Sequence, residues 1–272
     1  LDLINGNCLM PYAQLETGIR MYYEKHGSGE PLVLIMGTGF DHSGWDNQIE
    51  YYSKYFECII FDNRGVGKTE GSDSKFSTGL LAEDVLSLLD ILGVKKAHFS
   101  GISLGSCVAQ EIVIKRPNIA YSLQLHGTWA STEGYAERKF KSQIKLLKKL
   151  DMREFYEINV LWFLTPSFMK DNPSLVENMI ESATKKNCSK TFLIAQYKAD
   201  LNHYSIDRLH QISVPTLITV GSFDLAAPVQ YALQVRNEIS ESEMVVWENG
   251  GHLHNIENPK EFNMKTLEFM LR

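Results

Sequence analysis

Cysteine is scarce in this chain, and long apolar runs are missing. Four of the 272 residues are cysteines (Cys8, Cys58, Cys107 and Cys188). Their spacing contains neither a CxxC pair nor a metal-ligand pattern, which argues against a disulfide framework and a metal site. Cys58 and Cys107 fall in apolar segments, where a free thiol packs as a small hydrophobic side chain. We expect no signal peptide, and no run approaches the roughly 18 apolar residues that cross a membrane.

An excess of positive charge is also missing. The 27 Lys and Arg residues are outnumbered by 33 Asp and Glu residues, and the formal net charge is −6. This balance favours neither a nucleic acid nor an anionic membrane surface as a partner. The content of 44% hydrophobic and 22% charged residues is typical of a globular protein with a sizeable core. We expect a cytoplasmic monomer or homodimer that acts on a small-molecule substrate without a cofactor or metal.

Apolar runs typical of strands alternate with segments of helical periodicity over much of the chain. Several runs are almost continuously apolar, as in strands that are covered on both faces of a parallel sheet. The predicted strands are 14–19, 21–25, 31–36, 56–61, 97–99, 121–125, 214–220 and 243–247, and the predicted helices are 45–55, 81–92, 107–114, 229–239 and a last one after 259. This alternation indicates βαβ units. It predicts an α/β fold with a doubly wound, mostly parallel, eight-stranded sheet.

The alternation stops between residues 128 and 207, where the pattern is helical and no run resembles a strand. We therefore predict a helical cap at 128–207, inserted into a core domain made of residues 1–127 and 208–272. Aromatic residues of this insertion either line an apolar substrate pocket or pack the cap helices together. The candidates for the pocket are Trp129, Trp162, Phe163 and Phe168.

One serine stands in a Gly-x-Ser-x-Gly sequence between a predicted strand and a predicted helix. In that setting the sequence Gly101-Ile102-Ser103-Leu104-Gly105 is a nucleophile elbow. The glycines are expected because the turn is sharp and side chains there would collide with neighbouring backbone. Ser103 would then lie at the N-terminus of a helix, whose dipole favours developing negative charge.

A serine hydroxyl is a weak nucleophile that needs a base, and the base needs an orienting group. In open α/β sheets such groups follow the carboxyl ends of strands. Asp224 follows the seventh predicted strand and His252 follows the eighth. We predict Ser103 as the nucleophile, His252 as the base and Asp224 as the group that orients it, in the chain order Ser, Asp, His. Asp224 as a simple helix cap is the alternative.

Three other titratable side chains compete for these roles. Asp62 is the alternative acid, although its place after a strand also suits the ordering of a turn. His254 is the nearest substitute for His252. His126 follows a strand end, and it is either a pocket residue or a core histidine with satisfied hydrogen bonds; we include it among the pocket candidates.

The oxyanion of an acyl-transfer intermediate needs two hydrogen-bond donors. The backbone N–H of Leu104 is the first candidate because it directly follows the nucleophile. The second comes from the loop after the strand at 31–36, and we assign it to the N–H of Thr38, with Gly39 as the alternative. Gly37 and Gly39 are also candidates for lining the substrate pocket.

From about Gln14 to Arg272 the chain resembles the α/β-hydrolase superfamily. Within it, the chain looks most like the lid-bearing branch of 3-oxoadipate enol-lactonases, aclacinomycin methylesterases and cofactor-free haloperoxidase-like esterases. The resemblance is carried by Met36-Gly37-Thr38-Gly39, Trp45, residues 61–67, residues 101–105, residues 221–224 with Pro228, Gly251-His252 and Glu257-Asn258-Pro259. Many relatives have a histidine where this chain has Met36, which changes the loop but not the backbone donor.

The resemblance and the predicted triad imply a serine hydrolase. It would cleave a carboxylic ester or lactone of a small, partly apolar substrate through an acyl-enzyme intermediate. Thioester and carbon–carbon bond hydrolysis are alternatives, although typical carbon–carbon hydrolases have an Asn where this chain has Ile102. A ligand-binding, receptor-like protein with little turnover is an alternative of a different class.

Overall fold

A computed structural model describes residues 11–71, 76–185 and 188–272 of the chain. Its centre is an eight-stranded sheet in the order β1-β2-β4-β3-β5-β6-β7-β8. The strands are β1 (Tyr12–Gln14), β2 (Arg20–His26), β3 (Glu30–Ile35), β4 (Phe56–Phe61), β5 (Ala97–Ile102), β6 (Ala120–His126), β7 (Thr216–Gly221) and β8 (Ser242–Trp247). β3 to β8 are parallel, and β1 and β2 are antiparallel to their neighbours. The predicted doubly wound, mostly parallel α/β sheet is confirmed.

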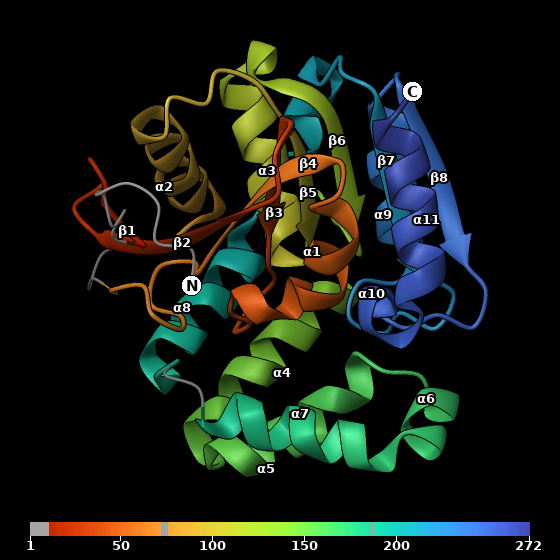
Figure 1. The fold of residues 1–272 in the computed structure, drawn as a ribbon. Coiled ribbons are helices and arrows are strands. Elements are labelled where there is room, and N and C mark those ends of the chain that lie inside the picture. The colour runs from red at the N-terminus through yellow and green to blue at the C-terminus, as the bar shows by residue number, and fades with distance from the viewer. Residues whose placement is uncertain (1–10, 72–75, 186–187) are drawn as a thin grey trace.

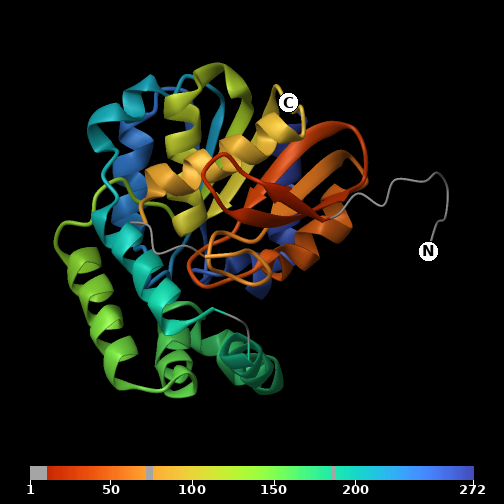
Figure 2. The same ribbon diagram turned by 90° about the vertical axis from the view of Figure 1, so that its left-hand side faces the viewer.

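Helices cover both faces of the sheet (Figures 1 and 2). Helices α2, α3 and α9 pack on one face, and α1 and α11 pack on the other. Helical bounds are η1 (His42–Trp45), α1 (Asp46–Tyr52), α2 (Thr78–Ile91), α3 (Leu104–Lys115), η2 (Pro117–Ile119), η4 (Ile206–Gln211), α9 (Val229–Glu238), α10 (His254–Glu257) and α11 (Pro259–Met270). In β3, Val33 and Ile35 join the first core and Leu32 and Leu34 the second. Each such buried side chain contributes roughly 1.5–3 kcal/mol.

The N-terminal hairpin is present, but the predicted strand at 14–19 is wrong. Only Tyr12–Gln14 pairs with β2, and residues 15–19 form the turn. The Leu15 N–H donates to the Ile19 carbonyl at 2.9 Å, and both side chains are buried at the end of the hairpin. Leu15 and Ile19 thus resemble strand residues in sequence, although their burial comes from the turn packing on the core.

The described residues between β6 and β7 form helices and no strand, and they lie beyond the carboxyl edge of the sheet (Figure 1). They are α4 (Tyr135–Lys149), α5 (Met152–Asn159), η3 (Val160–Trp162), α6 (Pro166–Asp171), α7 (Pro173–Lys185) and α8 (Lys190–Asn202). Phe140, Leu147 and Phe155 are buried in a third cluster within this part. The division into cap and core at residues 128 and 207 stays a prediction. In the described ranges, no helix has both the length and the apolar character to cross a bilayer.

The cysteines that the structure describes are buried and free. Cys58 lies in β4 and Cys107 in α3, as expected, and Cys188 precedes α8. Burial raises the pKa of the Cys58 and Cys188 thiols to about 12. These groups therefore stay protonated and pack as apolar side chains. Cys8 lies outside the described residues.

Two fully buried histidines make the stability of the fold depend on pH. His126 is hydrogen-bonded to the hydroxyls of Ser100 (3.0 Å) and Thr219 (2.8 Å). His203 is bonded to the hydroxyl of Thr78 at 2.9 Å. Burial lowers the pKa of His126 to about 3 and that of His203 to about 4. Both rings are therefore neutral in the folded protein at neutral pH.

We expect the free energy of unfolding to fall as the pH decreases from 7 to 5. In the unfolded chain a histidine takes up its proton near pH 6.5, whereas the folded rings take it up only at lower pH, so acid favours unfolding by about 2 kcal/mol for each ring. Urea unfolding at both pH values measures this loss. His203→Gln should show a smaller loss between pH 7 and pH 5 than the wild type, and equal losses would contradict the assignment.

Candidate active site

The turn between β5 and α3 places Ser103 in a strained conformation. Ser103 has φ 57° and ψ −123°, a backbone conformation that residues other than glycine rarely adopt. Its N–H donates to the His126 carbonyl at 2.8 Å, which holds the turn against β6. A Cβ on Gly101 would lie 2.3 Å from the Gly105 carbonyl oxygen, and a Cβ on Gly105 would lie 2.1 Å from that of Ile35. Both glycines are therefore required by close backbone contact.

Asp224 and His252 form a buried pair at the ends of β7 and β8. The Asp224 Oδ2 atom lies 2.7 Å from His252 Nδ1. Asp224 Oδ1 accepts hydrogen bonds from the backbone N–H groups of Ala226 (2.8 Å) and Ala227 (2.7 Å). The carboxylate is thus held in place, and a proton on Nδ1 leaves Nε2 as the basic nitrogen. His252 Nε2 has no hydrogen-bond partner among the described residues.

Ser103 and His252 line one small cavity of about 20 Å³. Gly37 and Thr38, from the loop after β3, line the same cavity. A Cβ on Gly37 would lie 3.0 Å from Ser103 Cβ and 3.7 Å from its Oγ, so this loop passes directly beside the hydroxyl. Asp224 lies on the other side of the His252 ring, beside a cavity of about 10 Å³.

The alternative acid and base lie elsewhere. Asp62 accepts hydrogen bonds from the backbone N–H groups of His42 and Lys68, both at 2.8 Å, and therefore orders the turn after β4. Hydrogen bonding to Asp62 raises the pKa of His42. His254 stacks on Trp247 with ring centroids 4.7 Å apart. Neither Asp62 nor His254 lines the Ser103 cavity.

The loop after β3 is held by one side chain from the sheet region and one from helix α8. Asn63 Nδ2 donates to the Met36 carbonyl at 3.0 Å. The Gly39 N–H donates to Gln196 Oε1 at 2.8 Å, so that N–H already has a partner. This favours Thr38 over Gly39 as a donor to an oxyanion. The Leu104 N–H begins helix α3, where backbone N–H groups have no partner within the helix.

A buried aspartate and a buried lysine also line the Ser103 cavity, and sequence analysis missed both. Asp200 of α8 is 1% exposed and Lys139 of α4 is 7% exposed. Thr38 Oγ1 donates to Asp200 Oδ2 at 2.7 Å, and Lys139 Nζ donates to the Ala226 carbonyl at 2.8 Å. Burial raises the pKa of Asp200 and lowers that of Lys139, and the attraction between the two charges opposes both shifts.

A sequence signal for these residues exists. Polar residues interrupt the buried faces of both helices at helical spacing. The buried residues are Ala136, Lys139, Phe140, Gln143 and Leu147 in α4, and Leu193, Gln196, Tyr197, Ala199 and Asp200 in α8. A charged residue on an otherwise apolar helix face marks either a paired core group or a site.

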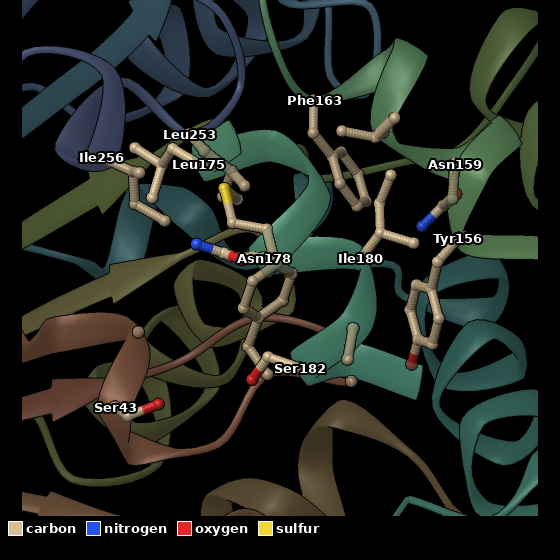
Figure 3. Close-up of a pocket in the computed structure, with 16 residues that line it drawn as sticks. Ser43, Tyr156, Asn159, Phe163, Leu175, Asn178, Ile180, Ser182, Leu253 and Ile256 are labelled. Atoms are coloured by element: carbon tan, nitrogen blue, oxygen red, sulfur yellow. The ribbon is translucent and has the colours of Figure 1, made fainter. Parts of the chain in front are cut away.

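Figure 3 shows the lining of an apolar chamber of about 280 Å³. The chamber adjoins the Ser103 cavity. The two share Phe40, Phe163 and Leu253. The remaining lining comes from the loop after β3, from η1 and η3, and from α5, α7 and α10, namely Gly39, Ser43, Gly44, Tyr156, Asn159, Val160, Leu175, Asn178, Met179, Ile180, Ser182, Ala183 and Ile256. Phe163 stacks on the His252 ring with centroids 5.4 Å apart. The chamber therefore begins directly beside the candidate base.

The structure corrects four of the pocket candidates. Trp129 packs on Phe140 in the third cluster, and Phe168 packs against the second core. Trp162 is half-buried and lines neither the chamber nor the Ser103 cavity. His126 lies behind the candidate triad, with both ring nitrogens bonded to hydroxyl groups. Of the predicted set, Gly37, Gly39 and Phe163 line the two cavities.

Glu257 joins the His252 loop to the helices between β6 and β7; the sequence motif contains this residue but did not predict these contacts. Its carboxylate accepts from the Gly251 N–H and the Thr165 N–H, both at 2.6 Å. The Leu253 N–H donates to the Phe163 carbonyl at 3.2 Å. The backbone on either side of His252 is therefore tied to the segment between η3 and α6.

Comparisons with known proteins agree with this architecture. The family model of the alpha/beta hydrolase fold matches residues 30–259. RutD of Agrobacterium fabrum, whose name proposes a carbamate hydrolase, is 28% identical over 257 residues, which cover 92% of this chain and 98% of that protein. A hydrolase from Pseudomonas aeruginosa superimposes with a TM-score of 0.88 at 25% identity, over 97% of this chain and 99% of that one.

The enol-lactonase of Burkholderia xenovorans superimposes equally well. Its TM-score is 0.88 at 23% identity, over 96% of this chain and all of that chain, 100%. At this identity the likeness concerns the fold. The chain belongs to the α/β-hydrolase fold family, as the sequence resemblance predicted, and it is a hydrolase of this type.

The elbow geometry predicts a sharp difference between two Gly→Ala variants. Gly105→Ala places a methyl group against the Ile35 carbonyl, so we expect the free energy of unfolding to fall by about 1–3 kcal/mol or more. Gly79→Ala in α2 is the matched control, because the nearest atom to its Cβ is Ser77 Oγ at 3.8 Å. That variant should be as stable as the wild type or slightly more stable. Similar unfolding curves for the two variants in urea would contradict the steric argument.

Proposed function

We propose that this protein hydrolyses a carboxylic ester or lactone with an apolar acyl part, through an acyl-enzyme on Ser103. The observation that carries the proposal is the shared cavity, which is lined both by Ser103 on its strained turn and by the His252 ring that is hydrogen-bonded to Asp224. A hydroxyl next to a basic ring nitrogen, with backbone donors beside it, is the arrangement that acyl transfer requires.

In the proposed reaction, Ser103 Oγ attacks the carbonyl carbon while His252 Nε2 takes the hydroxyl proton. The oxyanion accepts hydrogen bonds from the N–H groups of Thr38 and Leu104. Collapse of the intermediate breaks the ester C–O bond, and His252 gives its proton to the departing alkoxide. Water then attacks the acyl-enzyme, His252 takes a proton from it, and the acid leaves as that proton returns to Ser103. Asp224 holds the Nδ1 proton and stabilises the imidazolium in both halves.

The chamber supports an apolar acyl group as the part that is recognised. Its lining is dominated by aliphatic and aromatic side chains, and it starts at Phe163, next to His252. Helices α5 and α7 provide much of this lining, so we infer that residues 128–207 act as the substrate-binding cap. The chamber volume of about 280 Å³ lies near the lower end of the range for small-molecule sites, which suits a substrate of modest size.

Carbamate cleavage is the second candidate, because the RutD relative named for it matches over almost its whole length. The same serine, base and oxyanion donors serve a carbamate, an ester or a thioester, since each contains an acyl carbonyl with a leaving group. A substrate panel of p-nitrophenyl butyrate, a γ-lactone, a thioester and an N-alkyl carbamate ester distinguishes these classes by kcat/KM.

Ser103→Ala should reduce the hydrolysis of p-nitrophenyl butyrate by at least about 10³-fold, because the nucleophile is lost. A fluorophosphonate should label the wild type on Ser103, as located by peptide mass spectrometry. Ser53→Ala, which removes a hydroxyl at the end of α1, is the control and should keep full activity. Retained activity in Ser103→Ala, or labelling at another residue, would refute the proposed mechanism.

The chamber predicts a dependence on acyl length. Along the p-nitrophenyl esters from acetate to octanoate, each methylene that enters the chamber should raise kcat/KM about 4-fold, since burying one contributes about 0.8 kcal/mol. Ala183→Phe fills part of the chamber and should end this rise at a shorter chain. Ser174→Phe, on an exposed position of the same helix, is the matched control. A flat profile in the wild type, or the same shift in both variants, would exclude the chamber as the acyl site.

A further inference from the structure

We propose that Asp200 is a specificity-determining residue, whose Oδ1 atom accepts a hydrogen bond from a hydroxyl or N–H group next to the scissile carbonyl. The preferred substrates are then esters or lactones that carry such a donor on the carbon beside the carbonyl, together with an apolar chain. This inference rests on the proposed function and names the substrate class of the same site.

The two carboxylate oxygens of Asp200 have different surroundings. Oδ2 accepts from the Thr38 hydroxyl at 2.7 Å, whereas Oδ1 is buried and has no hydrogen-bond partner among the described residues. The side chain is 1% exposed and lines the cavity that contains Ser103 and His252. A buried carboxylate oxygen without a partner costs free energy, so a substrate group that donates a hydrogen bond to Oδ1 would gain that interaction.

Charge in the cavity favours Asp200 as an acceptor. The Lys139 ammonium lines the same cavity and stabilises the ionised carboxylate. Lys139 is itself held by the Ala226 carbonyl, in the loop that also binds Asp224. Burial raises the pKa of Asp200, so the carboxylate form increases as the pH rises above neutrality. An ionised carboxylate accepts hydrogen bonds and donates none.

The position of Asp200 limits where the substrate donor is attached. The Thr38 N–H is the proposed oxyanion donor, and the Thr38 hydroxyl is bonded to Asp200. A carbonyl oxygen bound at Thr38 therefore lies close to Asp200. A donor that reaches Oδ1 has to branch within a bond or two of the carbonyl carbon, while the chain continues past Phe163 into the chamber.

Three methyl esters test the assignment at pH 8: octanoate, 2-hydroxyoctanoate and 2-methoxyoctanoate, the last two as separate enantiomers. The hydroxyl and methoxy groups have similar effects on the carbonyl, but only the hydroxyl donates a hydrogen bond. For one enantiomer of each, the wild type should show a kcat/KM roughly 10- to 100-fold higher for the hydroxy ester than for the methoxy ester. In Asp200→Asn, which presents an amide N–H₂ group, this ratio should fall at least about 10-fold.

Thr38→Val tests whether Asp200 recognises the substrate or only supports the loop after β3. It removes the hydroxyl that holds Asp200 but keeps the backbone N–H, so it should lower kcat/KM for all three esters by a similar factor and preserve the ratio. A uniform loss in Asp200→Asn, with an unchanged ratio, would show that Asp200 only supports the loop and would overturn the inference. A wild-type ratio near one would also overturn it, independently of how any variant folds.

Methyl octanoate keeps the two proposals apart. Hydrolysis of this ester that disappears in Ser103→Ala supports the proposed function, whatever the hydroxy-to-methoxy ratio. If this activity is present and the ratio is near one, the inference about Asp200 fails alone. If none of the three esters is cleaved in a Ser103-dependent reaction, the ester function and the inference fail together.

Discussion

The close approach of backbone segments around the Ser103 turn is the constraint on which the candidate site depends. Gly101 and Gly105 leave no room for a Cβ, because carbonyl groups of the turn and of β3 lie 2.1–2.3 Å from where it would be. This contact lets β5 pass into α3 with a single residue at the crest, and it forces Ser103 to a positive φ. The packed sheet around the turn maintains that strain, which is typical of functional sites. The carboxyl ends of β3, β7 and β8 then place the loop after β3, Asp224 and His252 close to this turn.

Two parts of the chain meet at this point, and they contribute different chemistry. The sheet provides the proposed nucleophile, base and oxyanion donors, whereas the helices between β6 and β7 provide the chamber, Lys139 and Asp200. Hydrogen bonds join the two parts at Thr38 to Asp200, at Gly39 to Gln196, and through Glu257. The proposed recognition of substrate and the proposed chemistry therefore share the same loops. A change in how the helical part packs would alter the loop after β3 and the loop that carries His252.

Much of the core was predictable from local patterns. Apolar runs predicted the six parallel strands; β3 to β7 are largely buried, whereas the edge strand β8 is only partly buried. Helical spacing predicted the helices that flank them. Ser103 was proposed from its motif between a strand and a helix, and Asp224 and His252 were proposed because each follows the end of a predicted strand. The first strand was misplaced because Leu15 and Ile19 are buried by a turn. Trp129, Trp162 and Phe168 were misassigned to the pocket, whereas Phe163 does line it. An apolar residue has the same sequence pattern whether it faces a cavity or a neighbouring helix, as Phe163 and Trp129 illustrate.

The sequence by itself determined the order of the elements, the glycine-bounded serine turn and the residues that follow each strand. These features are local, since strand burial, turn sterics and helix periodicity depend on residues that are close in the chain. Only the tertiary structure decided that Asp200 and Lys139 line the cavity of the candidate nucleophile and base, and that Glu257 binds the backbone next to His252. The hydrogen bond between Thr38 and Asp200 joins residues that are 162 positions apart in the sequence, and it depends on how the helices between β6 and β7 pack on the sheet. Packing of this kind comes from the summed burial of many side chains, and no short segment encodes it.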